Sequence, residues 1–434
     1  MSRLRVAGGL VVTPEGAREA DVVIRDGRIA AVTPGGSAPR GDAGERPGGA
    51  REELLDARGC VVLPGGVDPH THPLPDLRRA SESALAGGTT TLLAFTAPRP
   101  GETPADAWRR AERELLPLAR TDVRLHPSIW EPERVRRADL VELRSLGATS
   151  VKLFLAYPEL GMMASDRTLY ETLRAARDLG LLTMVHCENG GAIEALVEEQ
   201  LAAGRTGVEG FVAARPPEVE EEAVARVLAL ARLAGAPVYL VHLSSAGSLE
   251  LVREARRRGQ AVWAEACTHH LLLDDSCYAR EDALAFLTVP PLRSREHVEA
   301  LWDGIADGTI DAVGSDHAQS PYRPDVPEGD FRAFPYGFAG VEVRLPALLS
   351  EGRRRGVAWE RLASLLAAAP ARAFGVAGKG AIAPGADADL VVWTPEEEWT
   401  VRAQELHDGR GSSPYDGLRL IGRVRVLVRG GRVE

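Results

Sequence analysis

The sequence has 434 residues, which is long for one ordinary domain. Hydrophobic residues make up 44% of it and charged residues 26%, a balance that excludes a disordered or fibrous chain and supplies a large core. The formal net charge of -10 argues against a nucleic-acid partner, because surfaces that bind nucleic acids are normally basic. These values indicate a large globular protein.

The cysteines and the apolar runs bear on location. Cys60, Cys187, Cys267 and Cys277 lie far apart and form no CxxC pair, so we expect a reduced, cytoplasmic protein rather than a disulfide framework. The N-terminal stretch MSRLRVAGGLVVTPEG lacks the long apolar core and small-residue cleavage site of a secretory signal. No run of about 18 apolar residues occurs, so we expect no transmembrane helix and no membrane partner.

Both ends of the chain are predicted to be β-rich. In residues 1–60, RVAGGLVVT and ADVVIRDGRIAAVTPGG are typical of hairpins, with Asp26 and Gly27 at a turn. Residues 34–53 are rich in Gly, Pro and charge, which predicts an exposed loop. Near the other end, ADLVVWTP and GRVRVLVRGGRVE are strand-like. We therefore predict one small β-sandwich domain, formed by residues 1–60 together with residues 381–434.

Residues 61–380 predict a different architecture, in which short apolar runs alternate with helical stretches such as PADAWRRAERELLPLA. The strand candidates are CVVLPGGVD, TTTLLAF, VRLHPSI, SVKLFLA, LLTMVHC, PVYLVHL, AVWAEAC and IDAVGSD. Near-continuously apolar strands separated by helices are typical of a parallel sheet buried on both faces, and eight such units close a barrel. We predict an α/β fold with a catalytic (β/α)8 TIM-like barrel over residues 61–380.

Polar residues that could bind a metal occur at the ends of these strands, where such barrels place their catalytic groups. They are His70 and His72 after the first strand, Lys152 in the fourth, His186 and His242 at the fifth and sixth, and Asp316 at the eighth. A lone HxH or a lone Asp has an ordinary structural interpretation, such as a helix N-cap for the Asp. Their joint occurrence favours a divalent metal site, because imidazole and carboxylate are common zinc ligands.

The segments around these residues resemble the amidohydrolase superfamily, and within it the dihydropyrimidinase/hydantoinase branch of the cyclic amidases. The matching segments are GGVDPHTH, GGTTTLLAF, SVKLFLAYPELGMMASD, TMVHCENG, YLVHLSSA, EACTHHLLLD, TVPPLRS, AVGSDHA, PGADADLVVW and SPYDGLRLIGRV. The resemblance covers nearly the whole chain. It implies an enzyme, assembled as a homodimer or homotetramer, that opens a small-molecule cyclic amide or imide, a dihydropyrimidine or 5-substituted hydantoin, to an N-carbamoyl amino acid.

The resemblance also implies roles for individual residues at a centre of two divalent metal ions, expected to be Zn2+. Lys152 would carry a carbamate derived from carbon dioxide and bridge both ions. His70, His72 and Asp316 would complete the more buried site, and His186 and His242 the more exposed one. Asp316 would act as general base and then general acid on the water and the leaving nitrogen. Tyr157 would donate a hydrogen bond to the oxyanion.

Around the expected metal centre, the residues that would bind the substrate depart in part from the family pattern. Tyr157, Val289 and Ala339 are the expected substrate-binding residues; Val289 and Ala339 stand where the family often has serine and asparagine, and would bind the ring's imide through the backbone. Dihydroorotases usually have an arginine shortly after HxH, whereas here the first is Arg78. The absence of a nearer arginine disfavours a dihydroorotase. The alternatives to a hydantoinase are, in order, an allantoinase, a dihydroorotase and a non-catalytic scaffold.

We also assign roles to other polar residues near these motifs. His269 and His270 follow the seventh strand and are expected at the rim rather than as ligands. His317 is open to either a site contact or a helix N-terminal position. Cys187 and Glu188 are expected to be structural.

Overall fold

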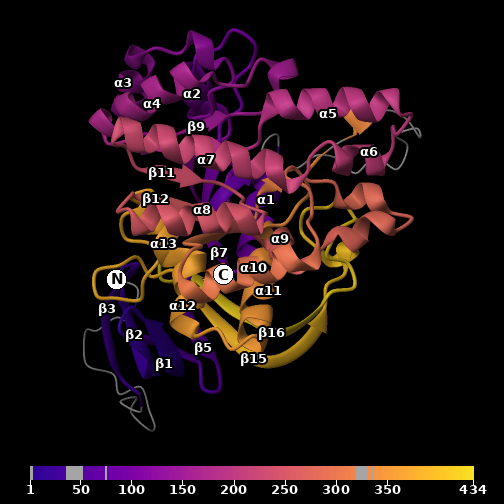
Figure 1. The fold of residues 1–434 in the computed structure, drawn as a ribbon. Coiled ribbons are helices and arrows are strands. Elements are labelled where there is room, and N and C mark those ends of the chain that lie inside the picture. Colours follow the sequence, from indigo (N-terminus) through magenta and orange to yellow (C-terminus); the bar gives the residue numbers. More distant parts are fainter. Residues whose placement is uncertain (1–2, 36–51, 74–75, 319–330, 335) are drawn as a thin grey trace.

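The computed structural model describes residues 3–35, 52–73, 76–318, 331–334 and 336–434. One part of the chain forms a barrel of parallel strands wrapped by helices, and another forms a sheet with strands from both chain ends (Figure 1). The predicted α/β fold, a (β/α)8 barrel with a small β domain, is confirmed. Of the loop predicted over residues 34–53, residues 36–51 lie outside the described part.

The barrel strands pair in sequence order. They are β6 (Gly66–His72), β7 (Thr89–Phe95), β8 (Asp122–His126), β9 (Ser150–Phe154), β10 (Leu182–His186), β11 (Val238–Leu240), β12 (Val262–Cys267), β13 (Ala312–Gly314) and the short β14 (His317–Ala318). β9 to β13 form one parallel group, and β14, β6, β7 and β8 form another. A bridge between Ser128 and Lys152 joins the groups at one seam, and β13 contacts β6 at the other. The carboxyl ends of the strands therefore meet at one mouth.

Helices cover the outside of the barrel. They are α1 (Leu77–Ala86), α2 (Pro104–Glu114), α3 (Arg137–Ser145), α4 (Asp166–Leu179), α5 (Gly190–Ala202), α6 (Val208–Ala213), α7 (Pro217–Ala234), α8 (Ala246–Arg257), α9 (Thr268–Leu272), α10 (Arg295–Asp307), α11 (Val341–Arg354), α12 (Trp359–Ala363) and α13 (Ala369–Ala373). Ser165 and Ser245 begin α4 and α8, because each side chain caps a free backbone NH. Gly180 and Gly235 end α4 and α7 in the left-handed conformation. α7 packs between α4 and α8 (Figure 1).

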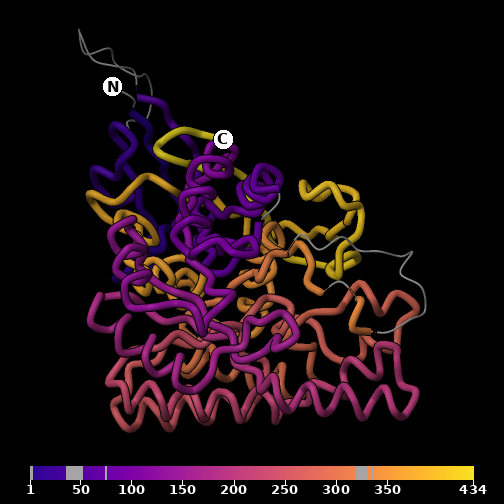
Figure 2. The backbone as a smooth tube through the Cα atoms, turned by 90° about the horizontal axis from the view of Figure 1, so that it is seen from above, coloured from indigo at the N-terminus to yellow at the C-terminus, as the bar shows by residue number. Residues whose placement is uncertain are grey.

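The second sheet joins both ends of the chain. Its strands are β1 (Arg3–Thr13), β2 (Gly16–Arg25), β3 (Arg28–Pro34), β4 (Glu52–Asp56), β5 (Val61–Pro64), β15 (Leu390–Thr400), β16 (Arg419–Arg429) and β17 (Arg432–Val433). They pair in the order β17, β16, β15, β5, β1, β2, β3, and β4 pairs with β1. Asp26 and Gly27 form the predicted turn, both with positive φ. The chain ends therefore lie on the same side of the molecule (Figure 2).

One predicted strand divides into two. The run CVVLPGGVD was expected to be the first barrel strand, but its first half forms β5, which pairs with β1 and β15 of the terminal sheet. The division falls at Gly65, whose NH donates to Asp389 O at 2.8 Å. A Cβ at Gly65 would clash with the Thr90 side chain, so glycine is required where the chain passes from one sheet to the other. The prediction of one strand was wrong because an apolar run does not reveal such a crossing.

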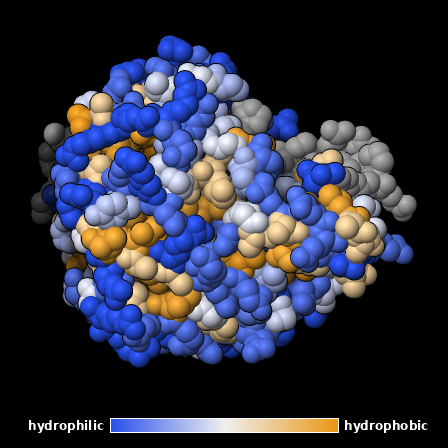
Figure 3. Space-filling view, turned by 45° about the horizontal axis from the view of Figure 1, so that its top comes forward, coloured by the Kyte–Doolittle hydropathy of each residue, from blue (hydrophilic) through white to orange (hydrophobic). Residues whose placement is uncertain are grey.

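The outer surface combines charged residues with small hydrophobic patches. Within the described part of the chain, no helix is both long enough and apolar enough to cross a membrane. The face drawn in Figure 3 is mostly hydrophilic, and its hydrophobic residues form separate patches between charged ones. Single exposed hydrophobic residues such as Leu160 and Leu233 are common on globular proteins.

Candidate metal centre

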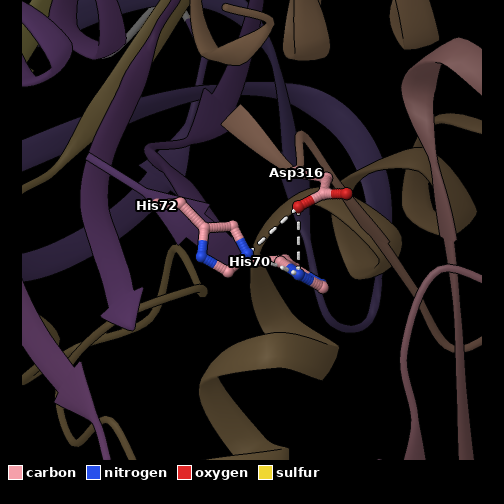
Figure 4. A group of neighbouring side chains, drawn as sticks. All are labelled: His70, His72 and Asp316. Carbon is pink, nitrogen blue, oxygen red and sulfur yellow. Dashed lines mark hydrogen bonds and ion pairs between the residues drawn. The ribbon is translucent and has the colours of Figure 1, made fainter. Parts of the chain in front are cut away.

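Three of the predicted residues lie together at the mouth of the barrel; we call His70, His72 and Asp316 the inner set. His70 and His72 project from β6, and Asp316 follows β13. Asp316 Oδ1 lies 3.1 Å from His70 Nε2 and 3.3 Å from His72 Nε2, and the two Nε2 atoms are 3.3 Å apart (Figure 4). Both imidazoles point to one side, as their spacing of two residues predicts.

The spacing within the inner set suits a divalent cation. Zinc binds imidazole nitrogen and carboxylate oxygen at about 2.0–2.2 Å, so two such ligands at a tetrahedral angle lie about 3.4 Å apart. The observed separations of 3.1 to 3.3 Å agree with that value. Burial opposes charging of His70, but the carboxylates of Glu265 and Asp316 outweigh it and raise its pKa to about 9. The space between the inner set therefore favours a positive charge, which a metal ion would supply.

A second pair of histidines, the outer set, lies beside the inner set. His186 ends β10 and His242 follows β11, and His186 Nδ1 is 2.9 Å from His242 Nε2. The His242 ring centroid is 5.4 Å from that of His70. Burial lowers the pKa of both outer rings, which favours the neutral form that binds metals. The two sets thus offer adjoining groups of ligands.

Lys152 lies in β9 among aromatic rings. Its Nζ is 5.2 Å from the ring centroid of Phe95 and 5.3 Å from that of Phe154. Phe95 also packs against both rings of the inner set. Lys152 is 1% exposed, and no residue described in the structure forms a hydrogen bond or ion pair with its amine. Burial lowers its pKa to about 8, so the amine is closer to neutral than an exposed lysine.

The backbone at the mouth is strained at three positions. Among the described residues other than glycine, φ is positive only at Asp26, Tyr157, His242 and Asp316, and it is 64°, 37° and 47° at the last three. Such conformations cost about 1–3 kcal/mol each and persist where the surroundings impose them. At His242, the buried Glu220 fixes the following loop by accepting hydrogen bonds from two backbone NH groups. Strain collected in this way is typical of functional sites.

Glu265 contacts the site but was missed in the sequence. It lies in β12 and is fully buried. Its Oε1 is 2.6 Å from His70 Nδ1, and this contact turns His70 Nε2 towards the rest of the inner set. The signal that could have found it is a single acid inside the otherwise apolar strand VWAEAC, because acids are rarely buried without a partner or a function.

Glu188, for which we expected only a structural role, contacts the outer set. Its Oε2 lies 2.8 Å from His186 Nε2 and 3.0 Å from Arg215 Nη1. Burial opposes its ionisation, but Arg215 and His186 outweigh this and lower the pKa of Glu188 to about 2. The guanidinium of Arg215 is also 5.9 Å from the ring centroid of Tyr157. Glu188 and Arg215 therefore connect the outer set with Tyr157.

Tyr157 lies at the edge of the centre. Its ring centroid is 5.2 Å from that of His186. Burial raises the pKa of its phenol, so the hydroxyl keeps its proton. No described residue forms a hydrogen bond with that hydroxyl, which leaves it able to donate to a bound molecule.

Val289 and Ala339 lie on neighbouring loops. Gly337 NH donates to Leu287 O at 2.8 Å, which brings these loops together. Val289 is half-buried and Ala339 is buried, so both side chains pack mainly against protein. Only their backbone is therefore suited to polar contact with a bound molecule.

Three other histidines lie close to the mouth. His270 donates to a backbone carbonyl at 3.1 Å, and His317 accepts from the Gly340 NH, just before α11, at 3.3 Å. His269 forms a group with Cys267 and Asp316 whose ligand atoms lie within 4.8 Å of one another. Because this group shares Asp316 with the inner set, it belongs to the same centre and is not a separate site.

A cavity of about 680 Å³ lies beside Tyr157, between the loops that follow β7, β8 and β9. Its apolar lining includes Pro98, Trp130, Val135, Leu160 and Met162, and its charged lining includes Arg99, Glu131 and Arg134. A cavity of this size and lining has room for an aromatic ring.

A barrel whose mouth gathers histidines, a lysine and an aspartate is typical of metal-dependent hydrolases. The chain belongs to the amidohydrolase family, whose model matches residues 61–432. It is 35% identical to the D-hydantoinase of Geobacillus stearothermophilus, covering 98% of this chain and 91% of that protein. It is 40% identical to the allantoinase of Rubrobacter xylanophilus, covering 98% and 93%.

Solved structures agree with this assignment. The dihydropyrimidinase from Brevibacillus agri superimposes with a TM-score of 0.92 at 32% identity, covering 99% of this chain and 94% of that chain. A D-hydantoinase superimposes with a TM-score of 0.91, also at 32% identity, covering 99% and 95%. The resemblance to hydantoinases and dihydropyrimidinases predicted from the sequence is confirmed.

Proposed function

We propose that this protein is a cyclic amidase that hydrolyses the ring of a dihydropyrimidine or a 5-substituted hydantoin to an N-carbamoyl amino acid. The observation that carries the proposal is the convergence of the inner set, with separations of 3.1 to 3.3 Å, beside the outer set and the buried Lys152. The near full-length similarity to D-hydantoinases and a dihydropyrimidinase supports the substrate class.

The ligand sets suit two divalent cations, for which we propose Zn2+. The inner set would hold one ion and the outer set the other, and Lys152, as a carbamate, would supply a further oxygen ligand. The carbamate would form when the neutral amine adds to carbon dioxide and loses a proton, and the pKa of about 8 that burial gives Lys152 favours that neutral amine. When bound, the cations would activate a water molecule and polarise the ring carbonyl.

Asp316 and Tyr157 would carry the proton transfer and the oxyanion contact. Burial opposes ionisation of Asp316, but His70 and His72 outweigh it and hold its pKa well below the usual value, so it begins as a base. It would accept a proton from the attacking water and pass it to the leaving ring nitrogen. The protonated hydroxyl of Tyr157 would donate a hydrogen bond to the developing oxyanion. The backbone at Val289 and Ala339 would bind the imide of the ring.

The cavity beside Tyr157 favours a 5-substituted hydantoin among these rings. Its apolar lining, which includes Trp130, Leu160 and Met162, suits an apolar or aromatic substituent. The second candidate is an allantoinase, favoured by the 40% identity to one such enzyme and by the charged side chains of Arg99 and Glu131, which would suit a polar substituent.

The test is ring opening of a substrate panel by the zinc-loaded protein: dihydrouracil, hydantoin, 5-phenylhydantoin, allantoin and dihydroorotate. We expect 5-phenylhydantoin to give the highest kcat/KM, because its ring fills the apolar cavity. Preference for allantoin would establish the second candidate. No turnover of any of the five by protein that carries two zinc ions would contradict the cyclic amidase proposal.

We further propose a cytoplasmic homodimer or homotetramer. All four cysteines are unpaired in the structure, which suits a reducing compartment. Light scattering on the purified protein measures the assembly, and a mass of about one 46.5 kDa chain would contradict it.

A further inference from the structure

The outer set is supported by a neutral ion pair. Glu188 holds His186 Nε2 at 2.8 Å, and the same carboxylate lies 3.0 Å from the guanidinium of Arg215. The negative charge of Glu188 is therefore balanced by an arginine whether or not a metal is bound.

The inner set is supported by a carboxylate that no arginine contacts in the described part of the chain. Glu265 Oε1 is 2.6 Å from His70 Nδ1 and accepts from the His242 NH at 3.1 Å, while Oε2 accepts from the Tyr239 hydroxyl at 2.7 Å. In the described part of the chain, no lysine or arginine pairs with Glu265; its one ion-pair contact is with His70. A buried carboxylate is costly without a counter-charge, and His70 is the one group in ion-pair contact with Glu265, so a cation held by His70 would take over the charge of the protonated ring.

We propose that Glu265 is a positioning residue for both ligand sets and supplies the negative charge that balances the inner metal ion. Through Oε1 it orients the ring of His70, a member of the inner set, and fixes the backbone of His242, a member of the outer set. The inference rests on the proposed metal centre.

The first experiment compares metal retention in Glu265→Gln and Tyr239→Phe variants with the wild type. The glutamine side chain keeps the size and a carbonyl acceptor for His70 but loses the charge, so we expect one of two zinc ions to bind about 10- to 100-fold more weakly. Tyr239→Phe removes only the hydroxyl on the other oxygen, and both ions should stay within about threefold of wild-type affinity. Zinc is measured by elemental analysis after equilibration with graded chelator.

The outcomes separate the two proposals. A wild type that binds no zinc contradicts the metal centre itself. A wild type with two zinc ions and a folded Glu265→Gln variant that retains both with unchanged affinity overturns the role of Glu265 alone.

A second measurement needs no variant at Glu265 and covers the case in which Glu265→Gln fails to fold. Long-range ¹H–¹⁵N spectra of zinc-loaded wild type, labelled at histidine, report which nitrogen of each ring carries the proton. We expect one metal-bound histidine to show a strongly hydrogen-bonded Nδ1–H, assigned to His70 by its loss in a His70→Asn variant. A proton on Nε2 of His70 would overturn the proposal.

Discussion

The two lysines of this protein show how differently its two regions use the same side chain. Lysine occurs only at positions 152 and 379, although Lys and Arg together number 52. At the base of the barrel, the Lys379 amine lies 2.6 Å from Asp389 and 3.3 Å from Asp387, and it also pairs with Asp122. At the mouth, the more deeply buried Lys152 pairs with no described residue. The base thus satisfies its buried charge, whereas the mouth leaves its amine available.

The surroundings of both positions favour lysine over arginine. The ammonium of Lys379 has three donors in tetrahedral directions, which suits three carboxylates around one atom better than a planar guanidinium. Asp122 begins β8 and Asp389 precedes β15, so this cluster ties the barrel to the terminal sheet. At position 152 the proposed carbamate would require lysine, because a guanidinium does not form a carbamate. In barrels of this type the base serves stability and the mouth serves function.

The largest effect is expected for Lys152→Ala. Loss of the bridging ligand should remove both metal ions and lower kcat/KM by at least about 10³-fold, since the activated water is lost with them. The free energy of unfolding of the metal-free protein should change little, because removal of a buried amine without a partner offsets the lost packing against Phe95 and Phe154. Elemental analysis, kinetics and urea unfolding measure the three quantities. A variant with two zinc ions and normal turnover would refute the carbamate assignment.

Tyr157→Phe should give the next largest effect. The variant loses the proposed oxyanion donor but none of the proposed ligands, so we expect kcat to fall about 10²- to 10³-fold with the metal content unchanged. KM should change little, since the hydrogen bond strengthens mainly in the transition state. Stopped assays at saturating substrate and elemental analysis test this. Unchanged kcat would exclude Tyr157 from the reaction.

The mouth was largely predictable from the sequence because its signals are local. The spacing of His70 and His72, and the polar residues at the ends of apolar strands, depend only on strand geometry and on the direction of parallel strands. Contacts between residues that are far apart in the sequence could not be predicted from it. Glu265 contacts His70 across 195 residues of sequence, and although the single acid in VWAEAC indicates a special residue, it does not indicate the partner.

The base was less predictable for the same reason. The passage of the chain at Gly65 from β5 to β6 depends on how closely Thr90 approaches, and the partners of Lys379 come from strands far apart in the sequence. The exact extent of the terminal domain depends on that packing. Local apolar runs therefore predicted that strands exist, but not to which sheet each belongs.

The smallest effect on activity, and the clearest on stability, is expected for Lys379→Met. The change leaves three carboxylates without their cation, so it should lower the free energy of unfolding by about 2–4 kcal/mol. Because Asp122 is half-exposed, water screens part of this interaction and the loss stays below that of a fully buried pair. Zinc content and kcat should stay near wild type, because the cluster lies at the base. Urea unfolding, elemental analysis and kinetics measure these quantities.

The pH dependence of that stability difference sharpens the comparison between the lysines. Burial opposes the charge on Lys379, but Asp122 and Asp389 outweigh it and raise its pKa. A raised pKa means that the stabilisation is fully present below the unfolded value of about 10.4 and is lost as pH rises through the folded value. The gap between wild type and Lys379→Met should therefore be constant from about pH 7 to 9 and shrink above about pH 11. If the difference in free energy of unfolding between wild type and Lys379→Met already disappears at about pH 8, the amine of Lys379 is held neutral, as burial tends to do for Lys152. The contrast between base and mouth would then be wrong.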